Sequence, residues 1–155
     1  MMPDHVRKQI RDAVVTGLTG LPSTADRVYA GRTRPLQVGH DPTLLVYTRA
    51  ETSQRAVLGR PPKIERRCTL HVEGRVSTAA PPDDLLDQIA AEIEAGIAAM
   101  INYGTSVFLG GLAQNVQLTA TEMVAEADGE RQIGGVRVEY LVTYRTVEGA
   151  PTAVA

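Results

Sequence analysis

Polar and apolar residues alternate with a period of two between Arg66 and Val76. The apolar side carries Cys68, Leu70, Val72 and Val76, and the polar side carries Thr69, His71, Glu73 and Arg75. A period of two is that of a β-strand with one buried face. The stretch therefore predicts a strand whose apolar side lies on a core.

A helical period follows directly after this strand. Pro81-Pro82-Asp83-Asp84 opens the segment and places acids at the positive end of a helix dipole. The apolar stripe consists of Leu85, Leu86, Ile89, Ile93, Ile97 and Met100. This spacing predicts an amphipathic helix over about 82–101, capped by Asn102 and Gly104. An earlier helix is predicted after Pro3-Asp4, with a stripe of Val6, Ile10, Val14 (or Ala13) and Leu18 (or Gly17).

The segments between the two helices differ in polarity. Val28-Tyr29 predicts a short strand, and 32–42 predicts a loop because it contains Pro35, Gly39 and Asp41-Pro42. In Thr43–Thr48 the odd- and even-numbered positions are both largely apolar, so both faces of a strand here would be apolar. This indicates a strand covered on both faces, or on one face with a partner chain on the other. Arg49–Lys63 is polar and predicts a long connection.

Two further strands are predicted at 116–125 and 136–147, joined by a tight turn at Asp128-Gly129. A plain hairpin would place Val138 opposite Thr119, so apolar residues would face polar ones. One extra residue in the second strand corrects this, pairing Val138 with Ala120, Tyr140 with Leu118, and Val142 with Val116. Gly134-Gly135 is the expected place for such a bulge.

These elements predict an α+β fold: a mixed, mainly antiparallel sheet with two helices packed on it, in the order α-β-β-β-α-β-β. The length suits a single domain over 1–155, with 148–155 as a loose tail. Cys68 is expected to be a small buried core residue. The N-terminus shows no signal peptide and no segment reaches membrane-spanning length, so a cytoplasm is the simplest compartment.

The sequence shows no catalytic, cofactor-binding or metal-binding pattern. His5, His40 and His71 have no metal-ligand spacing, and Cys68 and His71 point to opposite sides of their strand. Asp83, Asp84 and Asp87 are explained by the helix N-terminus. The formal net charge of −2 argues against nucleic acid as the main partner.

Two groups of charge stand out. The basic group lies within 49–67 and comprises Arg49, Arg55, Arg60, Lys63, Arg66 and Arg67, against the acids Glu51 and Glu65. The acidic group comprises Glu122, Glu126, Asp128 and Glu130, with no base among them. Both groups fit solvated loops. They also fit complementary surfaces of a homo-oligomer, in which the Glu126–Glu130 tip approaches the Arg49–Arg67 segment of the next copy in a head-to-tail ring.

Several stretches together resemble one protein family. They are the helix 6–21, Arg27-Val28-Tyr29, the strand 41–48, the Asp83–Asp87 helix start, the strand 134–146 and Glu148-Gly149-Ala150-Pro151. In this order they resemble the tail terminator (tail completion) proteins of long-tailed phages and phage-like particles.

The resemblance implies a structural virion protein at the tail–head junction, made in the bacterial cytoplasm. Such a protein forms a hexameric ring that caps the tail tube, stops its polymerisation and docks to the head connector. The implied partners are further copies of the chain, the major tail tube protein and the head–tail connector protein, with no membrane, and nucleic acid only passing through the lumen. No cofactor or active site is implied. A head-completion or neck protein and a small intracellular α+β binding domain are the alternative interpretations.

Overall fold

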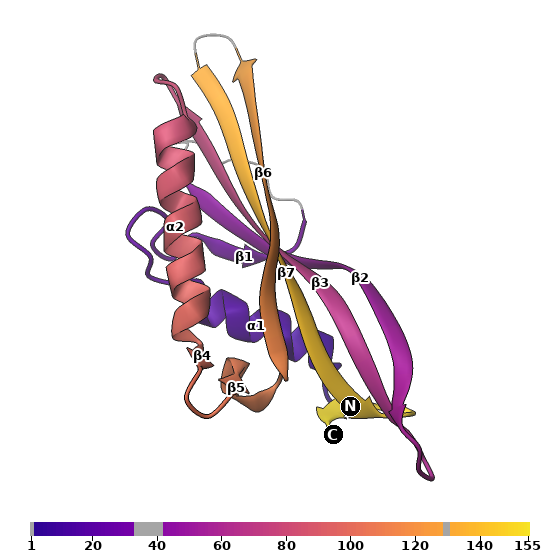
Figure 1. Ribbon diagram of the computed structural model, residues 1–155. Helices are drawn as coiled ribbons and strands as arrows, with labels where there is room; N and C mark the ends of the chain where they lie inside the picture. Colours follow the sequence, from indigo (N-terminus) through magenta and orange to yellow (C-terminus); the bar gives the residue numbers. More distant parts are fainter. Residues whose placement is uncertain (1, 33–41, 129–130) are drawn as a thin grey trace.

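The computed structural model describes residues 2–32, 42–128 and 131–155. Two helices, α1 (Val6–Leu18) and α2 (Asp83–Ala99), cover one face of a mainly antiparallel sheet (Figure 1). The strands of this sheet are β1 (Val28–Ala30), β2 (Thr43–Val57), β3 (Lys63–Thr78), β6 (Asn115–Asp128), β7 (Arg131–Val147) and β8 (Ala150–Val154). The predicted α+β class and the order α-β-β-β-α-β-β are confirmed. Short additions follow α2, namely β4 (Ile101–Asn102), β5 (Val107–Phe108) and the 3-10 turn η1 (Leu109–Gly111).

The strand order of the main sheet is β1-β2-β3-β7-β6, and β8 pairs with β7. Only β1 and β2 run parallel, while the other pairs in this sheet are antiparallel. β6 therefore forms one edge. β2 forms the other edge beyond the three residues that pair with β1.

The core lies between the helices and the sheet, as the apolar periods predicted. The stripe residues Val6, Ile10, Val14 and Leu18 of α1 and Leu86, Ile89, Ile93 and Ile97 of α2 are all buried. Cys68, Leu70, Val72 and Val76 of β3 are buried in the same cluster. Burial raises the pKa of the Cys68 thiol to about 12, so this thiol stays protonated and serves as a small core group.

Two glycines let α2 lie close to the sheet. A Cβ on Gly74 would come within 2.7 Å of Ile89 Cγ2, and a Cβ on Gly134 would come within 2.9 Å of Pro82 Cβ. Because real side chains do not approach so closely, these positions accept α2 only without a side chain. Gly134 is thus a packing position.

Gly74→Ala is expected to lower the free energy of unfolding by about 1–3 kcal/mol, because the added methyl group forces Ile89 or α2 to move. Gly135→Ala is the matched control, since its Cβ would meet only the Gly74 carbonyl oxygen at 3.6 Å. Urea unfolding of both variants tests this. Equal losses of unfolding free energy in the two variants would show that contact with α2 is not what excludes a side chain at position 74.

The hairpin of β6 and β7 is confirmed, but its bulge is elsewhere. Val116 pairs with Val142 and Leu118 with Tyr140, as predicted, and the register then shifts at Thr119 of β6. The expected bulge at Gly134-Gly135 is wrong, because β7 runs through both glycines without a break. The Thr119 hydroxyl donates hydrogen bonds to Glu139 Oε2 at 2.7 Å and to Glu139 O at 3.2 Å, which holds the extra residue.

The bulge changes the pairing toward the hairpin end. Val138 lies opposite Thr121, and not opposite Ala120 as predicted. Asp128 belongs to β6 and pairs with Arg131, so it is not a turn residue. Gly129, the other residue of the predicted turn, lies outside the described residues.

The predicted connection 49–63 is a β-hairpin, which corrects the sequence-based expectation. β2 continues to Val57 and β3 begins at Lys63, and the two strands pair over this whole stretch. Residues 52–60 are exposed because this part of the sheet extends beyond the helices (Figure 1). A strand that is polar on both faces shows no period of two, which explains why the sequence indicated a loop.

One other expectation is corrected. The end of the chain is not loose, because Ala150–Val154 forms β8 on β7 and the Gln9 side chain donates a 2.9 Å hydrogen bond to Thr152 O. The expected loop 32–42 lies almost entirely outside the described residues. Leu44, Leu45, Val46 and Tyr47 are buried within one chain, so this strand needs no partner chain to cover it.

Candidate assembly surfaces

A buried carboxylate joins three elements at the base of the β2–β3 hairpin. Glu51 accepts hydrogen bonds from Arg7 of α1 at 2.8 Å and from Arg66 of β3 at 3.2 Å, and the Tyr144 hydroxyl of β7 donates a short bond to it. The Glu51 side chain is only 10% exposed. Burial, with a contribution from Glu51, raises the pKa of Tyr144, so the phenol remains a proton donor. This network fixes the direction in which the hairpin leaves the core.

The far end of this hairpin is basic and carries exposed apolar groups. We call it the basic end, defined by Arg55, Val57, Leu58, Arg60 and Lys63. Leu58 is 88% exposed and Val57 is 44% exposed. Arg55 forms an exposed ion pair with Glu148 at 3.2 Å, whereas Arg60 and Lys63 have no ion pair within the described part of the chain.

A different side of the molecule, formed by α2, is acidic and contains a groove with both apolar and polar lining (Figure 1). α2 carries Asp83, Asp84, Asp87, Glu92 and Glu94 and no basic residue. The α2–β6 groove has a volume of about 180 Å³ and is lined mainly by Glu94, Ile97, Ile101, Tyr103, Leu118 and Tyr140. Tyr103 is 71% exposed and Leu118 is 43% exposed.

A polar depression of about 300 Å³ lies on the face of the sheet away from the helices. It is lined by Arg32, Tyr47, Arg49, Glu73, Arg75 and Arg137. Glu73 forms ion pairs with Arg75 at 3.3 Å and with Arg137 at 3.6 Å. Arg137 also forms an ion pair with Glu122 at 3.4 Å. The carboxylates of the same chain thus neutralise part of this arginine cluster.

His71 lies beneath this depression and is buried, although the strand period placed it on the polar side. Its ring stacks on Tyr47 with the ring centroids 5.2 Å apart. Burial lowers the pKa of His71 and outweighs the nearby Glu139 carboxylate, while the Arg137 guanidinium lowers this pKa further. The folded chain therefore holds His71 neutral.

The free energy of unfolding is expected to decline as the pH falls below about 6.5, because the unfolded chain then binds a proton at His71 that the folded chain excludes. His71→Phe keeps a ring on Tyr47 and removes the titration, so its decline should be shallower. The slope should not vanish, since the pKa of His5 is also lowered by burial. Urea unfolding between pH 7.5 and 5 measures both slopes. Identical slopes would contradict a role for His71.

The residues predicted at an interface fall in different places. Arg49 lines the polar depression, while Arg55, Arg60 and Lys63 lie at the basic end. Glu122 pairs with Arg137 of its own chain. Glu126 and Asp128 belong to β6, although their side chains lie outside the described part, as does Glu130 entirely. The outer end of β6 lies far from the basic end of the same chain (Figure 1).

Sequence reasoning missed three features, namely the Glu51 network, the α2–β6 groove and the polar depression. The only available signal for Glu51 was an acid within a basic segment, a feature that Glu65 shares. The groove had no signal, since Leu118 and Tyr103 come from different elements. Within the described ranges, no group of three His, Cys, Asp or Glu residues is placed to hold a metal ion. No helix in this part of the chain has both the length and the apolar character needed to cross a membrane.

No protein-family model and no curated protein matches the chain. Among solved structures, it is similar to the PVC sheath/tube terminator of an extracellular contractile injection system in its extended state, at 11% identity and a TM-score of 0.42. This match covers 100% of this chain and 62% of that chain, so the chain spans less than two thirds of that terminator. It is also similar to a chain of the virion of a native gene transfer agent particle, at 14% identity, a TM-score of 0.36 and 92% coverage of each chain.

Proposed function

We propose that this chain is a tail terminator, a structural virion protein that assembles into a ring on the end of a tail tube. The ring stops polymerisation of the tube and offers a docking surface for the head connector. The family resemblance of the sequence supports this proposal. So does one structural observation, namely that a basic end with exposed apolar groups and an acidic side with an apolar groove lie on different sides of one molecule.

Two different surfaces that complement each other produce a head-to-tail contact. Such a contact repeats from copy to copy and closes into a ring when the rotation between copies allows it. The proposal includes a hexamer, contacts with the major tail tube protein and the head–tail connector protein, and nucleic acid only in the lumen. The eight charged residues expected at the interface remain part of the proposal: Arg49, Arg55, Arg60, Lys63, Glu122, Glu126, Asp128 and Glu130.

The proposal assigns the protein no catalytic activity and no cofactor, because the sequence offers no nucleophile–base pair and no metal-ligand spacing. A metal bound at full occupancy in the purified protein would count against this part of the proposal. The polar depression is lined by arginines that are partly paired with carboxylates, and the groove is lined mainly by aliphatic and tyrosine side chains with Glu94, which fits contact surfaces.

Electron microscopy of particles made without this protein tests the proposed function. Overlong or headless tails are expected, because an uncapped tube continues to polymerise and lacks its docking surface. Supplying the parent gene in trans should restore tails of normal length. Normal particles would reject the proposal, and tails of normal length beside defective heads would favour the head-completion interpretation.

A further inference from the structure

We propose that the basic end of one copy docks in the α2–β6 groove of the next copy, with Leu58 as the inserted side chain. This inference rests on the proposed function, since it names the contact that repeats around the ring. It also predicts a contact between purified copies, which is measurable without the particle.

The basic end has an apolar side chain that its own chain leaves uncovered. Leu58 is the most exposed of the large apolar residues in the described part of the chain, at 88%. It lies between two paired strands whose base is fixed by the Glu51 network, so its position is set by the sheet. A large apolar side chain held in water on a rigid support gains free energy when a partner covers it.

The α2–β6 groove is a recess that its own chain leaves unfilled. Ile97, Ile101 and Leu118 give it apolar walls, and its volume of about 180 Å³ accommodates one branched aliphatic side chain. Tyr140, which also lines the groove, is only 4% exposed. Burial raises the pKa of Tyr140, with a smaller contribution from Glu94, so this hydroxyl remains a donor. An occupant that brings a backbone carbonyl, as the segment at Leu58-Gly59 does, offers this hydroxyl an acceptor.

Opposite charges on the basic end and around the groove favour the basic end over other apolar segments as the occupant. Residues 52–64 contain three bases and no acid. The groove is lined by Glu94, and the helix that forms one wall carries five acids and no base. Opposite charges around an apolar contact set the orientation and raise the association rate.

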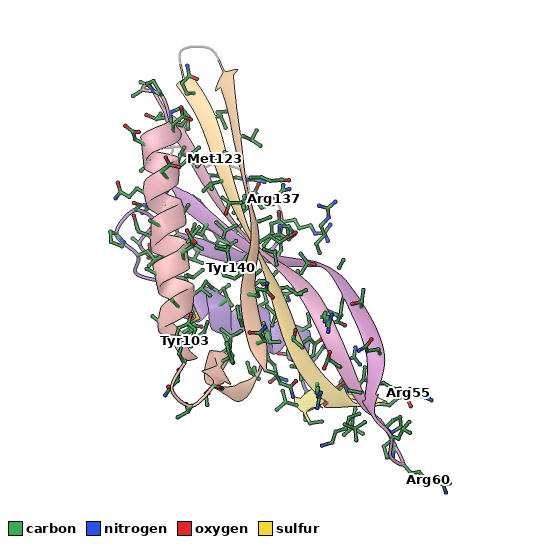
Figure 2. The ribbon with its side chains drawn as sticks, in the orientation of Figure 1. Arg55, Arg60, Tyr103, Met123, Arg137 and Tyr140 are labelled. Atoms are coloured by element: carbon green, nitrogen blue, oxygen red, sulfur yellow. The ribbon has the colours of Figure 1, made fainter. Side chains whose placement is uncertain are left out.

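The contact must form between copies. Figure 2 shows Arg55 and Arg60 at one end of the molecule and Tyr103 and Tyr140 on a different side, so a chain does not reach its own groove. The two surfaces are also unlike each other, so each docked copy leaves a free basic end and a free groove. Further copies add in the same sense, as a ring requires.

Disulfide trapping between purified variants tests the contact. Leu58→Cys and Leu118→Cys proteins are mixed at high concentration with oxygen and copper-phenanthroline as the oxidant. A disulfide-linked dimer is expected from the mixture, because docking brings the two Cα atoms within the roughly 4.4–6.8 Å that a disulfide allows. Neither variant alone should give it. Both positions are exposed, so folding should match the parent, and the buried Cys68 should not take part in the cross-link.

Val124→Cys is the matched control partner for Leu58→Cys. Val124 lies on the same edge strand and is more exposed than Leu118, at 57%, but it does not line the groove. Arg60→Glu in the Leu58→Cys chain should lower the yield roughly two- to fivefold at low salt, and Glu94→Arg in the Leu118→Cys chain should restore part of it. A mixture that gives no product, or as much product with Val124→Cys, overturns the inference.

The outcomes separate this inference from the proposed function. Trapped dimers together with normal tails in particles lacking the protein would keep the contact and reject the terminator role. Overlong tails without any Leu58–Leu118 product would keep the role and reject this contact.

Discussion

Glu51→Ala is expected to lower the free energy of unfolding by roughly 2–4 kcal/mol. The change removes the shared acceptor of Arg7, Arg66 and the Tyr144 hydroxyl. Tyr144 is fully buried and Arg66 is largely buried, so neither group recovers its hydrogen bond from bulk water. The expected loss is below that for a fully buried pair, because the Arg7 side chain is 37% exposed and is rehydrated.

Denaturant unfolding of Glu51→Ala and Glu148→Ala measures this effect against a matched control. Glu148 also pairs with an arginine of the β2–β3 hairpin, but both partners are exposed, so its removal should cost at most about 1 kcal/mol. Glu51→Gln should fall between the two, since its amide oxygen still accepts from one donor. If Glu51→Ala costs no more than Glu148→Ala, the network does not hold the hairpin on the core.

Ile93→Ala is expected to cost about 2–5 kcal/mol in the same measurement. Ile93 is completely buried at the centre of the α2 stripe, and truncation removes apolar contacts and leaves a cavity against the sheet. Leu86→Ala should cost a similar amount, because Leu86 is 1% exposed in the same cluster.

Glu94→Ala provides the control for these losses. Glu94 is next to Ile93 in the chain but exposed, and alanine is a strong helix former, so the change should stay within about 0.5 kcal/mol. A loss below about 0.5 kcal/mol for Ile93→Ala would mean that the stripe is not core.

The exposed edge strand β6 influences which kind of contact between copies is favoured in the proposed ring. β6 presents Leu118, Met123 and Val124 to solvent at 43–57% exposure, and long exposed edges favour association between chains. The bulge at Thr119 and the acids of β6 limit plain edge-to-edge pairing. This combination favours a contact through side chains in the groove over an indefinite sheet.

The parts of this protein whose burial follows a local period were predictable from the sequence alone. The stripes of α1 and α2, the alternation around Cys68 and the doubly apolar Thr43–Thr48 each predicted the observed element and its buried face. Which face of a helix or strand is buried is visible in the spacing of its own apolar residues. About ten consecutive residues are therefore enough to predict it. The pairing of Leu118 with Tyr140 was also predictable, because it matches two apolar residues near one turn.

The position of the bulge and the projection of the β2–β3 hairpin depend on tertiary packing. Gly134 of β7 serves the close approach of the α2 start, whereas the extra residue lies at Thr119 of β6, whose hydroxyl donates a hydrogen bond to Glu139 O. The polar half of β2 is a strand because β3 supplies its hydrogen bonds, which no local period reveals. Glu51 and the α2–β6 groove combine residues far apart in the chain, and such sites exist only once the packing of separate elements is set.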